Sequence, residues 1–326
     1  MDLFQQQASN RRRTWLVMAV FVAFLFFLGY GFDVAYLGTY FPIAGFVALG
    51  GGAIGAYASY HSGDRAVLAS ASAEPLADLL DQRVAPADRL KYQQFQNVVE
   101  EMTIAAGLPM PQLFIIPDPD PNAFATGRDP DHASLAVTKG LLDALNREEL
   151  QGVVAHEMSH VRNFDIRLMT VVAALVGAIV LLSDFARRGL FWGGGRRGGG
   201  SRSKDGGGIA GAVLMVAWIL AVILAPIIGQ ILAMMVSRRR ESLADASAAE
   251  LTRNPLALAN ALEKIEFAVE PTRAIKRGTA NLCIADPLGR KIGTREGFLS
   301  DLFASHPPMV KRIGALREMA YQTAQG

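Results

Sequence analysis

The sequence has little cysteine, little histidine and almost no net charge. Its single cysteine, Cys283, excludes an internal disulfide and is typical of a domain in a reducing compartment. The formal net charge of +2 gives no indication of nucleic acid as a partner. Internal repeats of the kind that build solenoids are also absent. Because only five histidines occur in 326 residues, two of them at a helical spacing rarely arise by chance and indicate a common role.

Hydrophobic residues make up 51% of the chain and are concentrated in blocks. The first block, Thr14 to Phe32, is uncharged and, at about 1.5 Å per residue, can approach the ~30 Å of a hydrocarbon core. It is longer than a signal-peptide core and no A-x-A site follows it, so it predicts an uncleaved anchor. The second, Phe41 to Tyr60, predicts another span, with a glycine-rich loop as the alternative. Its small residues favour close helix packing in lipid: Gly45, Gly50, Gly51, Gly52 and Gly55.

Two further hydrophobic blocks follow later in the chain, joined by a basic linker. Leu168 to Ser183 is short for a full span, whereas Ile209 to Val236 is long and carries Pro226, which predicts a kink. The glycine- and arginine-rich stretch 187–208 between them has the composition of a flexible linker. Its basic residues favour the cytoplasm, in conflict with a simple four-span order. Whether these two blocks fully cross the membrane stays open.

The charges around the first two blocks predict their orientation. Arg11, Arg12 and Arg13 precede the first block and Arg65 follows the second, whereas the connector carries Asp33 and no basic residue. The positive-inside rule places the N-terminus and the segment after Tyr60 in the cytoplasm. We expect a mainly α membrane protein with two hydrophobic hairpins, about four transmembrane helices, and a cytoplasmic α+β domain built from two chain segments. The expected divisions are a membrane hairpin 1–60, a first domain segment 61–165, a second hairpin 166–236 and a second domain segment 237–326.

Outside these blocks the sequence predicts helices and short strands. Proline, glycine and capping residues mark their boundaries. The expected elements are a helix Pro86–Ala106 stopped by Gly107; strands at Gln112–Ile116, Ala123–Thr126 and Ser134–Thr138; a helix capped by Asn146 with Glu149 in a capping box; and helices from Asn254-Pro255 and over Pro308 to Gln322.

The helix capped by Asn146 carries the strongest chemical signal, His156-Glu157-Met158-Ser159-His160. Positions i and i+4 share one helix face, so both imidazoles can reach a single ion. Glu157 lies beside them, where it can take a proton from an activated water. A pair of ordinary surface histidines is the alternative, but the helical context favours metal ligation.

A catalytic zinc needs a third protein ligand and one open position. The other histidines, His61, His132 and His306, show no helical pairing with the motif. Glu241 and Asp245 share a helix face, so one carboxylate can ligate while the other accepts a hydrogen bond from a ligand histidine. The alternative is a solvated face paired with Arg238, Arg239 and Arg240. A two-pass excursion between Arg167 and Ser237 would bring the two segments to the same side of the membrane.

The pattern His156-Glu157-x-x-His160-x-x-Asn163-x-Asp165, the pair Glu241-x-x-x-Asp245 and the four blocks resemble the HtpX family of bacterial membrane zinc peptidases. The stretches Asn122–Gly127 and Phe303–Pro307, with Arg312-Ile313, are similar to two further family signatures. The resemblance implies one zinc per chain on His156, His160 and Glu241, with Glu157 as general base. It implies supporting roles for Asp245, Asn163 and Asp165, and a zinc site similar to that of the CAAX prenyl endopeptidases. It also implies a stress-response role in clearing damaged proteins at the cytoplasmic membrane of a bacterium.

Two further site assignments concern substrate binding and the oxyanion. Substrate is expected to pair with an exposed strand edge at Asn122, Ala123, Phe124 and Ala125, with a buried strand as the alternative. His306 is expected either to donate to the oxyanion or to cap the last helix. The expected partners are protein or peptide substrates and the lipid bilayer, with no nucleic acid. A narrow-specificity processing peptidase and a non-catalytic zinc-stabilised scaffold are the rival functions, and the presence of Glu157 argues against the scaffold.

Overall fold

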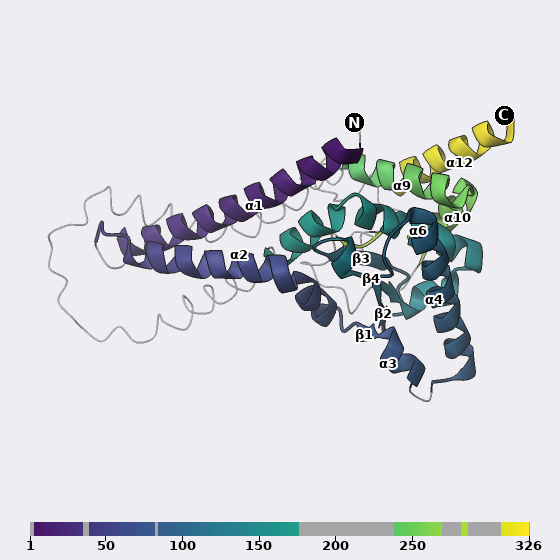
Figure 1. The fold of residues 1–326 in the computed structure, drawn as a ribbon, viewed down its shortest axis with the longest axis horizontal. Coiled ribbons are helices and arrows are strands. Elements are labelled where there is room, and N and C mark those ends of the chain that lie inside the picture. Colours follow the sequence, from purple (N-terminus) through teal and green to yellow (C-terminus); the bar gives the residue numbers. More distant parts are fainter. Residues whose placement is uncertain are drawn as a thin grey trace.

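The computed structural model describes residues 3–34, 39–81, 84–175, 238–268, 282–285 and 308–325. Over these residues the fold is mainly helical with one small mixed sheet. Two long helices, α1 and α2, lie side by side and project from a body that holds the sheet and the remaining helices (Figure 1). The fourth hydrophobic block, the glycine- and arginine-rich linker and the end of the third block lie outside the described residues.

Helices α1 (Leu3–Phe32) and α2 (Ile43–Ser70) are the two candidate membrane spans of the described chain. The apolar stretch of α1, Ala8–Phe32, has 25 residues and a mean hydropathy of 2.2, and that of α2 has 28 residues and 1.3. Only 11% and 17% of their most apolar windows are buried, so neither is the core helix of a soluble domain. Their length is sufficient for a bilayer of about 30 Å. The expected first hairpin is therefore present as a pair of helices.

Small residues allow α1 and α2 to pack closely. A Cβ atom on Gly29 would lie 2.5 Å from the carbonyl oxygen of Ala44, and one on Gly52 would lie 2.9 Å from Cδ1 of Leu25. Such contacts are the way helices associate in lipid, where the hydrophobic effect gives no driving force. Gly45 also faces α1. At the other glycines of the second block, an added Cβ would meet no atom of the described residues within 4 Å: Gly50, Gly51 and Gly55.

Helix α2 begins on a buried carboxylate. Asp33 accepts hydrogen bonds from the backbone N–H of Ala44 at 2.9 Å and of Gly45 at 3.0 Å. These donors lie in the first turn, where the helix dipole favours a negative charge. Helix α2 then runs through residue 60 to Ser70, with a break in helical geometry at Ser62. The membrane hairpin is thus joined to the body by α2 itself, which is kinked at Ser62.

The sheet has the strand order β1-β2-β4-β3. β2 and β4 are parallel, whereas β1 pairs with β2, and β3 with β4, in antiparallel fashion. All three predicted strands are confirmed, and β1 is an addition whose two residues carry no strand pattern. The strands are β1 (Glu74–Pro75), β2 (Gln112–Ile116), β3 (Ala123–Gly127) and β4 (Ala133–Thr138). β3 therefore forms one edge of the sheet.

The predicted helix over Pro86–Ala106 and the predicted starts at Asn146 and Asn254 are confirmed, whereas α3 and α5 are additions and the last helix extends to Gln325. Gly107, with φ of 65°, ends α4 in the left-handed conformation that glycine adopts without strain. Asn146 and Glu149 form a capping box at the start of α6, and Asn254 caps α10. The helices are α3 (Leu76–Asp81), α4 (Pro86–Ala106), the 3-10 turn η2 (Pro130–His132), α5 (Lys139–Ala144), α6 (Arg147–Arg162), α9 (Arg238–Thr252), α10 (Pro255–Glu266) and α12 (Met309–Gln325).

Helix α6 lies at the centre of the body and is buried along most of its length. It packs against β3, α4, α9 and α10. A Cβ on Gly152 would lie 2.9 Å from the backbone nitrogen of Leu258, so only glycine permits this approach to α10. The main hydrophobic core surrounds α6 on these sides. The histidines of the motif are therefore held on a rigid helix.

A second helix, residues 165–175, follows α6 after a turn at Asn163 and Phe164. It is the described part of the third hydrophobic block, and its apolar side chains are buried in the body. Val171 and Leu175 pack with Met18 and Phe21 of α1. The end of the motif helix is thus joined directly to the membrane hairpin.

Candidate metal centre

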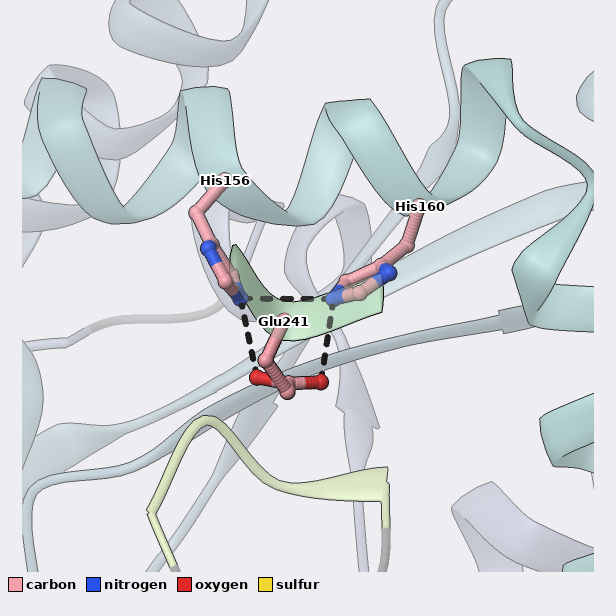
Figure 2. Close-up of side chains that lie close together, drawn as sticks. All are labelled: His156, His160 and Glu241. Atoms are coloured by element: carbon pink, nitrogen blue, oxygen red, sulfur yellow. Dashed lines mark hydrogen bonds and ion pairs between the residues drawn. The ribbon is translucent and has the colours of Figure 1, made fainter. Parts of the chain in front are cut away.

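Three buried side chains from two helices converge on one point (Figure 2). His156 and His160 lie one turn apart on α6, and Glu241 lies in the first turn of α9. The two Nε2 atoms are 3.3 Å apart. Each lies 3.6 Å from a different carboxylate oxygen of Glu241. The three donor groups therefore form a nearly equilateral triangle.

This triangle fits a zinc ion. Two ligands at 2.0–2.1 Å from a tetrahedral zinc are about 3.3 Å apart, close to the three edges observed. The chemistry of the donors agrees, because an imidazole that donates through Nδ1 presents a lone pair at Nε2. Two such lone pairs and a carboxylate repel one another in a buried site unless a cation lies between them. The predicted zinc ligands His156, His160 and Glu241 are thus brought together.

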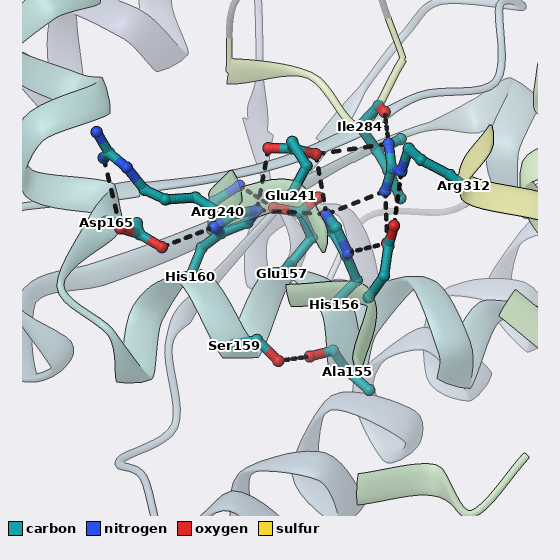
Figure 3. A network of polar contacts seen from close by, with 12 residues as sticks. Ala155, His156, Glu157, Ser159, His160, Asp165, Arg240, Glu241, Ile284 and Arg312 are labelled. Atoms are coloured by element: carbon teal, nitrogen blue, oxygen red, sulfur yellow. Dashed lines mark hydrogen bonds and ion pairs between the residues drawn. The ribbon is translucent and has the colours of Figure 1, made fainter. Parts of the chain in front are cut away.

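His156 is held from behind by a carboxylate and an arginine (Figure 3). Its Nδ1 lies 2.9 Å from Oδ1 of Asp245, and Arg312 donates to the two oxygens of Asp245 at 2.9 and 2.7 Å. Burial by itself lowers the pKa of His156, but the hydrogen bonds that Asp245 and Glu241 accept from the imidazole outweigh it and raise this pKa to about 9. The chain places Asp245 where a carboxylate orients a ligand histidine.

His160 is held in the same manner at the other end of the motif. Its Nδ1 lies 3.2 Å from Oδ2 of Asp165, and Arg240 lies 3.4 Å from Oδ1 of the same carboxylate. Asn163 ends α6, and its backbone N–H donates to the carbonyl of Ser159. Each ligand histidine thus contacts an aspartate, and each aspartate in turn contacts an arginine. This arrangement fixes both imidazole rings before a metal binds.

Glu157 is buried beside the three ligands. Its Oε2 accepts a 2.8 Å hydrogen bond from the backbone N–H of Ala125 in β3. Burial raises the pKa of Glu157, the effect expected when a carboxylate loses water, while the neighbouring histidines and this hydrogen bond oppose the rise. A carboxylate with a raised pKa next to a metal is suited to accept and return a proton. The position matches the expected general base.

Among the four residues expected to bind substrate, Ala125 contacts the site through its backbone hydrogen bond to Glu157. Asn122, Ala123, Phe124 and Ala125 are all buried, and the last three belong to edge strand β3. The segment 282–285 lies beside them, since Ile284 N–H donates to Ala123 and the Asn122 amide donates to Ala285. The strand β3 is thus an edge strand of the sheet, as expected for substrate pairing, and it is also buried, as expected for the alternative. Substrate binding at this strand stays a prediction, and His306 lies outside the described residues.

Two arginines of the site had no assigned role in the sequence. The sequence identifies Arg312 only as part of a family signature. It offers Arg240 only as an ion-pair partner of Glu241 and Asp245 on a solvent-exposed helix face. In the structure Arg240, Glu241 and Asp245 are only 5%, 6% and 4% exposed, so this face of α9 is buried. An arginine next to an acidic residue has the same sequence pattern in a surface ion pair and in a buried site. Only the packing of α9 on α6, and of α12 on α9 and α10, distinguishes the two.

A capped helix with two histidines one turn apart, a buried glutamate between them and a third carboxylate ligand from a later helix define a zinc metallopeptidase. The profile of peptidase family M48 matches residues 89–320. The chain belongs to this family. Its zinc site is formed by His156, His160 and Glu241, and its substrates are proteins or peptides.

Relatives match the chain along nearly its whole length. A protease HtpX homolog of Caldanaerobacter subterraneus subsp. tengcongensis is 41% identical over 326 residues, covering 97% of this chain and 98% of that protein. Another, from Streptococcus thermophilus, is 41% identical over 317 residues, covering 97% and 100%. The crystal structure of Ste24p from S. mikatae is similar with a TM-score of 0.45 and 17% identity, covering 96% of this chain and 66% of that one. The relatives confirm the resemblance found in the sequence.

Replacing Asp245 by alanine is expected to weaken zinc affinity by about 10- to 100-fold, the usual effect of losing a group that orients a ligand. The structure adds a second reason. Without Asp245, the guanidinium of Arg312 lies 3.5 Å from Nε2 of His156 with its main counter-charge removed. Zinc affinity is measured by competition with a chelator. Glu250→Ala, an exposed carboxylate on the same helix, is the matched control, and equal affinities in the two variants would contradict the role of Asp245.

Proposed function

We propose that the protein is an integral endopeptidase of a bacterial cytoplasmic membrane that degrades damaged membrane proteins in a stress response. The observation that carries the proposal is the direct connection between the zinc site and the membrane hairpin. The helix 165–175 leaves the motif helix and packs on α1 and α2, whose outer faces carry large exposed apolar side chains. These include Trp15, Leu16, Phe27, Phe46, Val47 and Ile54. A site attached to the bilayer in this way favours substrates that are themselves in the membrane.

The chain's own residues divide the chemistry between them. Bound zinc supplies Lewis-acid polarisation of the water and of the scissile carbonyl. Glu157 accepts a proton from the attacking water and returns it to the leaving amine, which a buried carboxylate with a raised pKa does well. Ala125 holds the Glu157 carboxylate in place through its backbone N–H. Asp245 and Asp165 keep the two imidazoles oriented, and Asn163 ends the motif helix.

Substrate is proposed to lie along β3, next to Glu157. Ala125 of this strand donates to Glu157. Asn122, Ala123 and Phe124 directly precede it in the chain, and β3 is an edge strand of the sheet. An extended peptide that adds to such an edge gains backbone hydrogen bonds without regard to sequence. This mode agrees with broad specificity. His306 is proposed as an additional donor to the oxyanion.

Digestion of two substrate types tests the proposed function. Full-length protein in detergent or nanodiscs is incubated with an unfolded membrane protein and, separately, with a short prenylated peptide, each with and without a chelator. The proposal expects chelator-sensitive cleavage of the membrane protein at several sites. Cleavage of the prenylated peptide alone would favour the narrow-specificity processing peptidase. Zinc binding without cleavage of either would favour the scaffold.

The proposed orientation places both termini, the body and the second domain segment in the cytoplasm, with the α1–α2 connector outside. The motive is the position of Arg11 to Arg13 and Arg65 around the hairpin. In a Cys283→Ala background, Tyr40→Cys is expected to react in intact cells with an impermeant thiol reagent, and Arg65→Cys only after lysis. Both side chains are exposed, so each is a control for the other's accessibility. The reverse labelling pattern would overturn the orientation.

A further inference from the structure

We propose that Asn10, at the start of the first membrane helix, is a positioning residue for the zinc ligand His160. Asn10 is separated from the motif by about half of the chain, yet its side chain is 3% exposed and contacts the end of the motif helix. Its Nδ2 donates to Oδ1 of Asp165 at 2.7 Å and to the backbone carbonyl of Asn163 at 3.0 Å. The inference rests on Asp165 orienting His160.

These two hydrogen bonds use the full donor capacity of the amide. An asparagine NH₂ group has two hydrogens, and here one goes to the residue that ends α6 and the other to the first residue of the next helix. The amide thus fixes the turn between the two helices. Since Asp165 lies in this turn, the amide also fixes the direction of its carboxylate. The other oxygen of Asp165 lies 3.2 Å from Nδ1 of His160.

The charges around Asp165 explain why a neutral donor is useful here. Arg240 lies 3.4 Å from the same oxygen that accepts from Asn10, a distance at the long end for a hydrogen bond. The shorter bond, at 2.7 Å, comes from the asparagine. A charge-assisted hydrogen bond of this length constrains the carboxylate without adding a further positive charge near the metal. Asn10 therefore fixes the orientation of the Asp165 carboxylate, which the longer contact with Arg240 constrains less.

Helix α1 holds Asn10 rigidly enough to act in this way. One turn further along, buried Thr14 donates to the carbonyl of Asn10 at 2.9 Å. Trp15 then stacks on Tyr60 of α2 with ring centroids 5.9 Å apart. Met18 and Phe21 pack against the helix 165–175. The position of α1 on the body therefore affects the orientation of His160, through Asn10 and Asp165.

The inference is tested by zinc affinity and by the spectrum of the cobalt-substituted protein, neither of which needs activity. In full-length protein, Asn10→Ala is expected to weaken zinc affinity by about tenfold, the lower end of the range for groups that orient ligands. The visible bands of bound cobalt(II), which report ligand geometry, are expected to shift. Thr103→Ala is the matched control, because it removes a buried polar side chain that bonds the backbone of its own helix, α4, and contacts neither Asn10 nor Asp165. It is expected to lower the melting temperature while zinc affinity and cobalt spectrum stay as in wild type.

A double-mutant cycle decides the case even if Asn10→Ala is poorly folded. Asn10→Asp places two carboxylates together and is expected to weaken zinc affinity more than tenfold. In an Asp165→Asn background the same change restores a hydrogen bond with donor and acceptor exchanged, so its cost is expected to fall at least tenfold. Equal costs in the two backgrounds would overturn the inference. So would a wild-type zinc affinity in Asn10→Ala, or a loss in Thr103→Ala equal to that in Asn10→Ala. Failure of the proposed function would appear separately, as wild-type protein that binds zinc but cleaves nothing.

Discussion

The Glu157→Gln protein is expected to bind one zinc per chain and to cleave its substrates about 100- to 10,000-fold more slowly, the range for loss of a general acid–base group. Glutamine has nearly the same volume, and its amide oxygen can still accept the hydrogen bond from Ala125. It cannot take a proton from water. The expected loss therefore lies in kcat, with zinc content unchanged. Initial rates and metal analysis on the same preparation measure both.

A conservative change outside the reaction is the control for Glu157→Gln. Glu250→Gln makes the same chemical substitution on an exposed face of α9 and is expected to leave kcat at the wild-type value. The role of Glu157 would be refuted by cleavage at a substantial fraction of the wild-type rate. A variant without zinc would instead show that Glu157 supports the metal rather than the reaction.

The Glu241→Ala protein is expected to lose zinc and, with it, all measurable proteolysis. Glu241 provides the one negative charge among the three ligands. One of its oxygens lies 3.6 Å from Nε2 of His156, and the other lies 3.6 Å from Nε2 of His160. Without it, Arg312, which lies 3.5 Å from a Glu241 oxygen, opposes a divalent cation. His156→Ala is expected to lose zinc as well, since it removes a ligand of the same triangle. Metal analysis after dialysis measures the loss.

Glu250→Ala is again the control for Glu241→Ala, because it removes a carboxylate from the same helix without entering the site. Its zinc content is expected to equal that of wild type. Retention of stoichiometric zinc by Glu241→Ala would show that the third ligand lies elsewhere. A fall in zinc in both variants would show an effect of the helix and not of the ligand.

Local signals in the sequence predicted the elements and ligands well. The helix over Pro86–Ala106, the three strands and the capping box at Asn146 depend on neighbouring residues, so periodicity and turn chemistry suffice to place them. His156 and His160 follow from a single helix turn. Glu241 was more difficult, since its carboxylate reaches the histidines only through the packing of α9 on α6.

The supporting groups of the site could not be predicted in the same way. Asn10, Arg240 and Arg312 act through contacts with residues far away in the chain, and each has an ordinary sequence context. Asn10 precedes three arginines, a pattern that indicates a cytoplasmic flank and nothing more. A contact between a helix start and a turn some 155 positions later leaves no local trace. Its discovery depends on the fold.

The order of the contributing segments along the chain has a consequence for biosynthesis. Asn10 leaves the ribosome first, the two histidines follow after the first hairpin is made, and Glu241 and Arg312 come only after the whole second hydrophobic region. Until Glu241 emerges, the nascent chain holds two of its three metal ligands, and the arginine that pairs with Asp245 comes later still. A partly synthesised chain therefore lacks a complete zinc site and cannot cleave peptide bonds in itself or in neighbouring proteins.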